Sequence, residues 1–221
     1  GTFSEQVKAM ISQLAHDSLE DSDADVTLLK GTSESLQIAD RSVDFVLSSP
    51  PYCTRIDYAV ATRIELAVLG YKDETTFDSL RRSLIGASTV SAAIPEASSS
   101  WGATCLEFLS DLKGHKSKSS HSYYYLNHLQ YFGAIQRSLT EISRVMKQSS
   151  SCVLVLQDSY YKDIHNDLPK MIIEMFEKTG LGLKHRKDFP LQRTRAGIHP
   201  GSKKYRKVFG ATESVLCFAK T

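Results

Sequence analysis

The residues with the clearest chemical pattern are Ser49, Pro50, Pro51 and Tyr52, which end the apolar run "VDFVLS". Proline has no N–H and a fixed φ, so the carbonyl of a Pro-Pro pair can be aimed stiffly at a ligand. The serine hydroxyl adds a second hydrogen-bond acceptor, and the tyrosine ring can stack on a flat ligand. A loop that only has to turn would use Gly, Asn or Asp instead. The pattern indicates a loop that holds a nucleobase, and the alternative is a surface turn in which Tyr52 packs on a sheet edge.

A second chemical pattern is the basic segment from Lys184 to Lys207, in which Asp188 is the only acidic residue. We expect the phosphate-binding side chains of this segment to be Arg193, Arg195, Lys203, Lys204 and Arg206. The alternative is a solvated basic hairpin. The net charge of the whole chain is only +2 and identifies no partner by itself.

Composition excludes several other classes of protein. The chain has 221 residues, of which 41% are apolar and 24% charged, as in ordinary globular domains. We therefore expect a single domain, residues 1–221. The four cysteines form no C-x-x-C pair and the seven histidines show no ligand spacing, so no metal site is predicted. No apolar stretch approaches ~20 residues, and the N-terminus lacks a secretory signal pattern. A reducing, cytoplasmic location in a prokaryotic cell is expected.

The elements that must position these residues follow from apolar periodicity and capping signals. The predicted elements are a helix at 3–19, strands at 26–30 and 43–49, helices at 57–69, 104–114 and 123–147, a strand at 152–159, a helix at 166–180, and strands at 183–189 and 213–220. Residues 72–121 have weak periodicity and are predicted to be an insertion that recognises the target or forms a lid. The helix at 3–19 either packs in the core or docks a partner.

This order of elements predicts an α/β fold with a doubly wound, mostly parallel sheet and an antiparallel hairpin at its edge. Ligands of such sheets bind beyond the carboxyl ends of the strands. Both the Ser-Pro-Pro-Tyr loop and Asp158 lie at such strand ends. For Asp158 two roles stay open, contact with a cofactor or target, and a local cap or turn.

The stretch "LLKGTSESLQIADRSVDFVLSSPPY" resembles the catalytic region of S-adenosylmethionine-dependent DNA amino-methyltransferases, which methylate exocyclic nitrogens of cytosine or adenine. Their loop reads Asp, Asn or Ser, then Pro-Pro, then Tyr, Phe or Trp, as at residues 49–52. The stretches "YFGAIQRSLTEISRVMKQSSSCVLVLQDS" and "ATESVLCFAK" are similar to the family's next helix, strand and closing strand. The resemblance covers most of residues 26–221 and implies a Rossmann-like methyltransferase sheet, with S-adenosylmethionine as cofactor and DNA as substrate.

The resemblance gives the loop residues chemical roles. An exocyclic amino nitrogen is a poor nucleophile because its lone pair is delocalised into the ring. Acceptors from Ser49 and Pro50 would favour a tetrahedral nitrogen, and Tyr52 would stack on the flipped base. Pro51 completes the rigid pair. Serine in the first position favours N4 of cytosine over N6 of adenine.

One part of the family pattern is missing. The family binds its cofactor through a Gly-rich strand-to-helix loop of the type Phe-x-Gly-x-Gly, and the chain contains no such stretch. The cofactor contacts implied for this chain are Gly31, Thr32 and Asp158, and Thr32 replaces the usual Asp. The predicted sheet is therefore incomplete.

Three explanations for the missing loop stay open: the chain is half of a split enzyme, a fragment, or a non-catalytic subunit. We favour a split enzyme whose partner polypeptide carries the Gly-rich motif and covers an exposed strand edge. The alternative functions are a nucleic-acid-binding subunit without catalysis and an RNA amino-methyltransferase.

Overall fold

The computed structural model describes residues 25–53, 56–87, 89–90, 94–191 and 210–220, together with the isolated residues 5, 8 and 12. The chain divides into two compact units, Gly1–Lys30 and Gly31–Thr221, and the sheet and long helices belong to the second. Most of the helix predicted at 3–19 lies outside the described residues.

The central sheet has four strands in the order β1 (Val43–Ser48), β2 (Met146–Gln157), β6 (Ala211–Lys220) and β5 (Leu181–Leu191). β1 and β2 run parallel, whereas β6 is antiparallel to both β2 and β5. A two-stranded sheet is formed by β3 (Ser159–Tyr161) and β4 (Ile164–Asn166). The antiparallel hairpin of β5 and β6 confirms the predicted edge hairpin.

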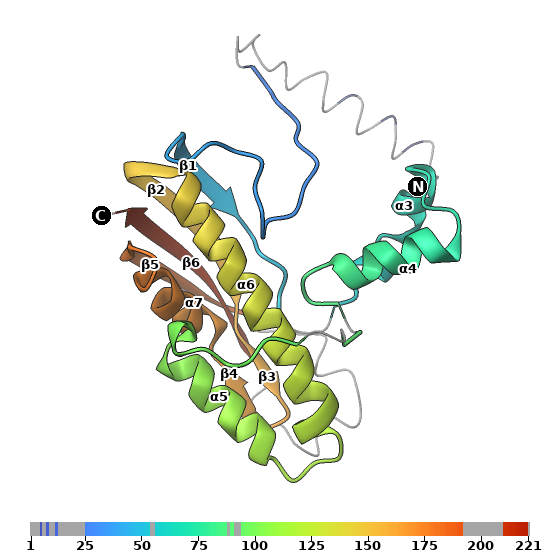
Figure 1. Ribbon diagram of the computed structural model, residues 1–221, viewed down its shortest axis with the longest axis vertical. Coiled ribbons are helices and arrows are strands. Elements are labelled where there is room, and N and C mark those ends of the chain that lie inside the picture. Colours follow the sequence, from blue (N-terminus) through green and yellow to red (C-terminus); the bar gives the residue numbers. More distant parts are fainter. Residues whose placement is uncertain are drawn as a thin grey trace. The chain divides into compact units, whose positions relative to one another are not determined.

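The connection from β1 to β2 contains most of the helices (Figure 1). They are α2 (Tyr58–Ala61), α3 (Arg63–Val68), α4 (Glu74–Ser83), α5 (Ala103–Gly114) and α6 (Tyr125–Val145), and α7 (Leu168–Glu177) follows β4. The predicted helices at 104–114, 123–147 and 166–180 are confirmed. The side chain of Asp167 caps α7 by accepting the Lys170 N–H. The predicted helix at 57–69 breaks at Thr62 and ends before Gly70, which has a φ of 99°.

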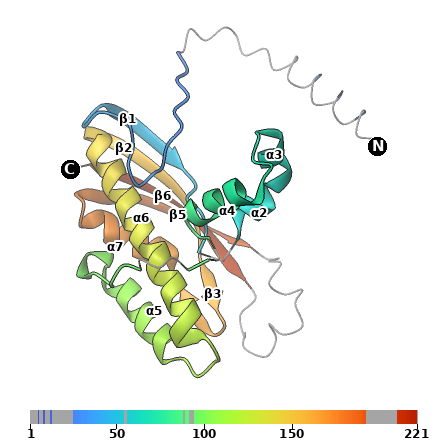
Figure 2. The same ribbon diagram turned by 45° about the vertical axis from the view of Figure 1, so that its right-hand side comes forward.

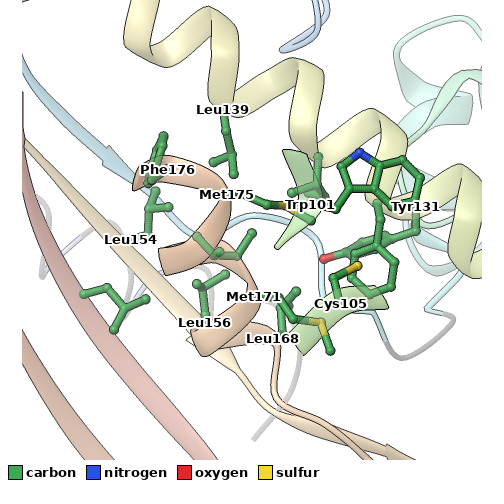
Figure 3. Packing of buried hydrophobic residues seen from close by; sticks show 14 of the residues in the cluster. Trp101, Cys105, Tyr131, Leu139, Leu154, Leu156, Leu168, Met171, Met175 and Phe176 are labelled. Carbon is green, nitrogen blue, oxygen red and sulfur yellow. The ribbon is translucent and has the colours of Figure 1, made fainter. Parts of the chain in front are cut away.

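The hydrophobic core lies on one face of the sheet, under α5, α6 and α7 (Figures 1 and 2). Alternate β2 residues, Cys152, Leu154 and Leu156, point to this face and are fully buried. Their partners on β6, Leu216 and Phe218, face the same way because directly paired residues share a side of a sheet. Figure 3 shows how α7 fills the space above β2 and meets Leu139 of α6. Residues 103–114 of the predicted insertion are part of this core.

The opposite face is more open at β1. Phe45 and Leu47 point there, since they pair with β2 residues of the other face, and they are 55% and 69% exposed. In the described part of the chain no strand pairs with the free edge of β1. A row of backbone N–H and C=O groups is therefore open to pairing along that edge.

Three expectations need correction or stay open. The described sheet is mixed, not mostly parallel, because only one of its three strand pairings is parallel. Residues 26–30 form no strand, although Val26, Leu28 and Leu29 are apolar, and among the described residues no strand pairs with them. The second helical layer of a doubly wound sheet is not found among the described residues, so that part of the prediction stays untested.

Candidate functional site

The Ser-Pro-Pro-Tyr loop leaves the sheet at the carboxyl end of β1. Ser49 is exposed, and its hydroxyl donates a 3.3 Å hydrogen bond to the Val155 carbonyl of the neighbouring strand. Pro50, Pro51 and Tyr52 are half-buried. The loop therefore starts on the sheet and turns toward the helices.

Two tyrosine hydroxyls bind the peptide unit between Pro51 and Tyr52. The hydroxyl of Tyr131, on α6, donates to the Pro51 carbonyl at 2.7 Å. The Tyr52 N–H donates to the hydroxyl of Tyr58, on α2, at 3.0 Å. Tyr131 is only 3% exposed, and burial raises the pKa of its phenol well above the ordinary value. The hydroxyl of Tyr131 thus stays protonated and remains a donor.

The Tyr52 side chain is held at its far end by Glu213, near the start of β6. Its hydroxyl donates to Glu213 Oε1 at 3.1 Å. Burial raises the pKa of Tyr52, the carboxylate of Glu213 raises it further, and the Ser49 hydroxyl acts in the opposite direction. The ring therefore has a fixed tilt and a neutral hydroxyl at ordinary pH.

The predicted insertion supports this loop from a third side. Asp57 caps α2 by accepting the Val60 N–H at 3.2 Å, and its second carboxylate oxygen accepts a 2.6 Å bond from Arg81 of α4. Gly86 follows α4 with a φ of 82°, and a Cβ there would lie 3.8 Å from the Tyr52 carbonyl. Gly86 therefore lies close to the loop, and Arg81 holds the cap of the helix that follows it.

The turn at Gly31 and Thr32 lies beside α6, some way from the loop along the helix. Thr32 accepts backbone bonds from Glu34 and Ser35, and Gly31 is exposed. Arg137 of α6 pairs with Glu34 at 2.6 Å. Glu34, which follows this turn, and Gly86, which follows α4, both line a cavity of about 460 Å³.

The chain after this turn is tied to the end of α6 by Arg144. Its guanidinium donates to the carbonyls of Leu36 and Ile38 and pairs with Asp40 and Glu141. The hydrogen bond from Arg144 is the main reason why the pKa of Glu141 falls to about 2. These bonds fix the point at which the chain enters β1.

Asp158 lies at the carboxyl end of β2, as predicted, but both of its carboxylate oxygens already have partners. One oxygen accepts the Thr212 N–H at 2.7 Å, and the other is 3.0 Å from His165 Nε2. These bonds join the ends of β2, β4 and β6. The geometry favours the capping role of Asp158, and its contact with a cofactor stays a prediction.

The other predicted contacts can be placed only in part. Arg193, Arg195, Lys203, Lys204 and Arg206 lie outside the described residues. In the part that the structure describes, no group of acidic, histidine and cysteine side chains could hold a metal ion. No described helix has both the length and the apolar character needed to cross a membrane.

Tyr58, Tyr131 and Glu213 were not predicted as site residues from the sequence. Tyr131 is 80 residues from Pro51, and Glu213 is 161 residues from Tyr52, so no local spacing links them to the loop. One signal was present in the sequence, since Tyr131 interrupts the aliphatic face of α6 with a hydroxyl that needs a partner when buried.

Comparison with solved structures finds a similar chain from Thermus thermophilus, described as a "putative DNA modification methylase". The identity is 13% and the TM-score 0.39, with 86% of this chain and 50% of that chain covered. The present chain thus spans about half the length of that protein. No protein-family model and no curated protein matches the chain. At this TM-score the likeness assigns no function, and the proposal below depends on the loop.

Proposed function

We propose that the chain is the base-holding part of an S-adenosylmethionine-dependent DNA amino-methyltransferase, with N4 of cytosine preferred over N6 of adenine. The observation that carries the proposal is the Ser-Pro-Pro-Tyr loop at the carboxyl end of β1, held from three sides by Tyr58, Tyr131 and Glu213. A surface turn would not need such support.

The loop offers the groups that an amino base requires. In the described part of the chain no hydrogen bond reaches the Pro50 carbonyl, so it can accept one from an exocyclic NH₂. The exposed hydroxyl of Ser49 is the second acceptor. Two acceptors around the nitrogen favour a lone pair that points out of the base plane. A base lifted from the duplex would stack on Tyr52, at a gain of about 1–3 kcal/mol.

S-adenosylmethionine, when bound, supplies a methyl group attached to a positively charged sulfur. The residues of this chain do not form a complete site for it, because the sequence has no Gly-rich strand-to-helix turn. Glu34 lines the cavity of about 460 Å³, and we assign it, with the preceding Gly31 and Thr32, to the edge of the cofactor site. We assign the rest of the cofactor site to a partner polypeptide.

The free edge of β1 supports the partner proposal. No described strand pairs with this edge, so its backbone groups match another strand, and Phe45 and Leu47 would pack against that strand's neighbours. A strand parallel to β1 would end at the same edge of the sheet as the loop. The Gly-rich turn of the partner would then lie next to Ser49 and Tyr52.

The second candidate function is a nucleic-acid-binding subunit without catalysis, and the missing Gly-rich turn favours it. A third, an RNA amino-methyltransferase, uses the same loop chemistry. The three functions differ in cofactor binding and in substrate, so one set of assays separates them.

The test is transfer of a labelled methyl group from S-adenosylmethionine to DNA and to RNA by the full chain, alone and with the protein encoded by the neighbouring gene. We expect transfer to DNA in the presence of the partner and its loss in Ser49→Ala. Transfer to RNA alone would support the third function. Nucleic-acid binding without cofactor binding or transfer in any combination would refute the enzyme and leave the second.

A further inference from the structure

One peptide unit of the loop is bound at both of its polar ends. Its carbonyl, from Pro51, accepts from Tyr131 at 2.7 Å, and its N–H, from Tyr52, donates to Tyr58 at 3.0 Å. The two tyrosines come from different elements, α6 and α2, so they hold the peptide plane from two directions.

We propose that Tyr131 and Tyr58 are positioning residues that set the direction of the Pro50 carbonyl and of the Tyr52 ring through this shared peptide unit. The inference rests on the proposed function of the loop. Neither tyrosine is assigned contact with the base or the methyl donor, so their effect passes through the loop.

The backbone of the loop makes this arrangement effective. Pro50 and Pro51 have fixed φ angles, so ψ of each proline is the main freedom left. Tyr131 and Tyr58 together fix the plane that follows Pro51, and therefore its ψ. A rotation of this plane would break both hydrogen bonds and turn the Tyr52 ring at the same time. The loop is thus preorganised before a base arrives.

Each tyrosine is itself held in place. Tyr131 is buried beside Phe132, with ring centroids 5.4 Å apart, and Figure 3 shows its ring near Trp101 and Cys105. Tyr58 begins α2, whose cap Asp57 is bound to Arg81 of α4. Packing in the core therefore positions the Tyr131 hydroxyl, and the Asp57–Arg81 ion pair positions the Tyr58 hydroxyl. The loop itself contributes little to these positions.

The first measurement is amide hydrogen exchange at Tyr52 in the full chain, followed by NMR, which needs no substrate. Tyr131→Phe and Tyr58→Phe each remove one hydroxyl and keep the ring. Loss of a single hydrogen bond shifts an opening equilibrium by about two- to tenfold, and we expect exchange at Tyr52 to accelerate by that factor. The double variant should accelerate it by less than the product of the two factors, because both bonds hold one plane.

Tyr161→Phe is the matched control. Its hydroxyl lies 2.7 Å from Ser120 in another buried hydrogen bond, so the variant loses a comparable contact away from this peptide unit. We expect similar loss of stability and no change in exchange at Tyr52. Unchanged exchange in Tyr131→Phe, or equal acceleration in the Tyr161→Phe control, would overturn the proposal.

The second measurement is methyl transfer under the conditions in which the unmodified chain is active. We expect kcat to fall about two- to tenfold in Tyr131→Phe, with KM for S-adenosylmethionine unchanged. A change in exchange without a change in kcat would refute the positioning role. Absence of transfer by the unmodified chain would instead count against the proposed function, and the exchange experiment would still show whether the two hydroxyls hold the plane.

Discussion

The helix-covered face of the sheet and the edge at β1 differ in how completely their side chains and backbone groups are packed and paired. Under α5, α6 and α7, the side chains of β2 and β6 are fully buried, and Phe176 meets Phe218 with ring centroids 4.7 Å apart. At β1, one edge has no neighbouring strand in the described chain, and Phe45 and Leu47 remain more than half exposed. The Ser-Pro-Pro-Tyr loop begins where these two regions meet.

The difference explains how half a site can be well formed. Three hydrogen bonds that shape the loop come from α6, α2 and β6, through Tyr131, Tyr58 and Glu213. In the described part of the chain, none of these three bonds comes from the unpaired edge of β1. The base-holding groups can therefore be in place before anything covers the edge of β1.

The largest effect is expected when the same change, Phe to Ala, is made in each of the two regions and the losses of stability are compared. Phe176→Ala removes a fully buried ring and should lower the free energy of unfolding by about 3–5 kcal/mol. Phe45→Ala removes the same ring from an exposed position and should cost within about 1 kcal/mol. Urea denaturation of both variants measures the difference. Equal losses would show that the face carrying Phe45 is covered in the free chain.

The next effect concerns the loop. Tyr52→Ala removes the stacking ring and should weaken base binding by about 1–3 kcal/mol. Tyr52→Phe keeps the ring and loses the hydroxyl that bonds Glu213, so it should retain most of the methyl transfer. Transfer rates of the two variants, compared with their thermal unfolding, test the prediction. Equal rates for Tyr52→Ala and the unmodified chain would remove the stacking role.

A smaller effect is expected from the bond between the loop and β6. Burial and then Glu213 raise the pKa of Tyr52 above the ordinary 10.0, so Glu213→Gln should lower it while the contribution of burial remains. Because folding favours the protonated phenol, stability falls as pH rises from the unfolded pKa through the raised native one, and the fall should be smaller in Glu213→Gln.

The titration is followed by NMR of ¹³C-labelled tyrosine, with Tyr52→Phe to assign the signal. The titration of Tyr161 serves as the control, because its hydroxyl bonds Ser120 and not Glu213, and Tyr161→Phe assigns its signal. An unchanged Tyr52 titration in Glu213→Gln would mean that the 3.1 Å bond does not form in solution.

The smallest effect on stability is expected at the free edge. Leu47→Lys places a charge on a side chain that is 69% exposed, and unfolding free energy should change within about 0.5 kcal/mol. The same variant should abolish methyl transfer with the partner, because a charge would be buried at the new interface. Calorimetric binding to the partner measures this effect, and unchanged affinity would place the interface elsewhere.

Much of the fold could be predicted from local patterns. The helical periodicity of α6, the polar residues and Pro169 at the start of α7, and the apolar run of β6 were sufficient to locate these elements. The predicted strand at 26–30 was wrong because an apolar run becomes a strand only beside another strand. α4 and the short β3–β4 hairpin were not predicted, since polar helices and three-residue strands give little periodic signal.

The candidate site also has a part that could be predicted from local sequence and a part that could not. Ser49 to Tyr52 could be predicted because the four residues are adjacent, whereas Tyr131 and Glu213 reach the loop only through the fold. The role of Asp158 could not be settled from its position at a strand end, because its bonds to Thr212 and His165 depend on two other strands.

The proposed function is tested most directly by the identity of the methylated nucleoside. DNA treated with the chain, its partner and S-adenosylmethionine is digested to nucleosides and analysed by mass spectrometry against standards. We expect N4-methylcytosine, absent when Ser49→Ala replaces the unmodified chain. A methyl group on a ring carbon of cytosine, or no methylated nucleoside while the partner and DNA are bound, would contradict it.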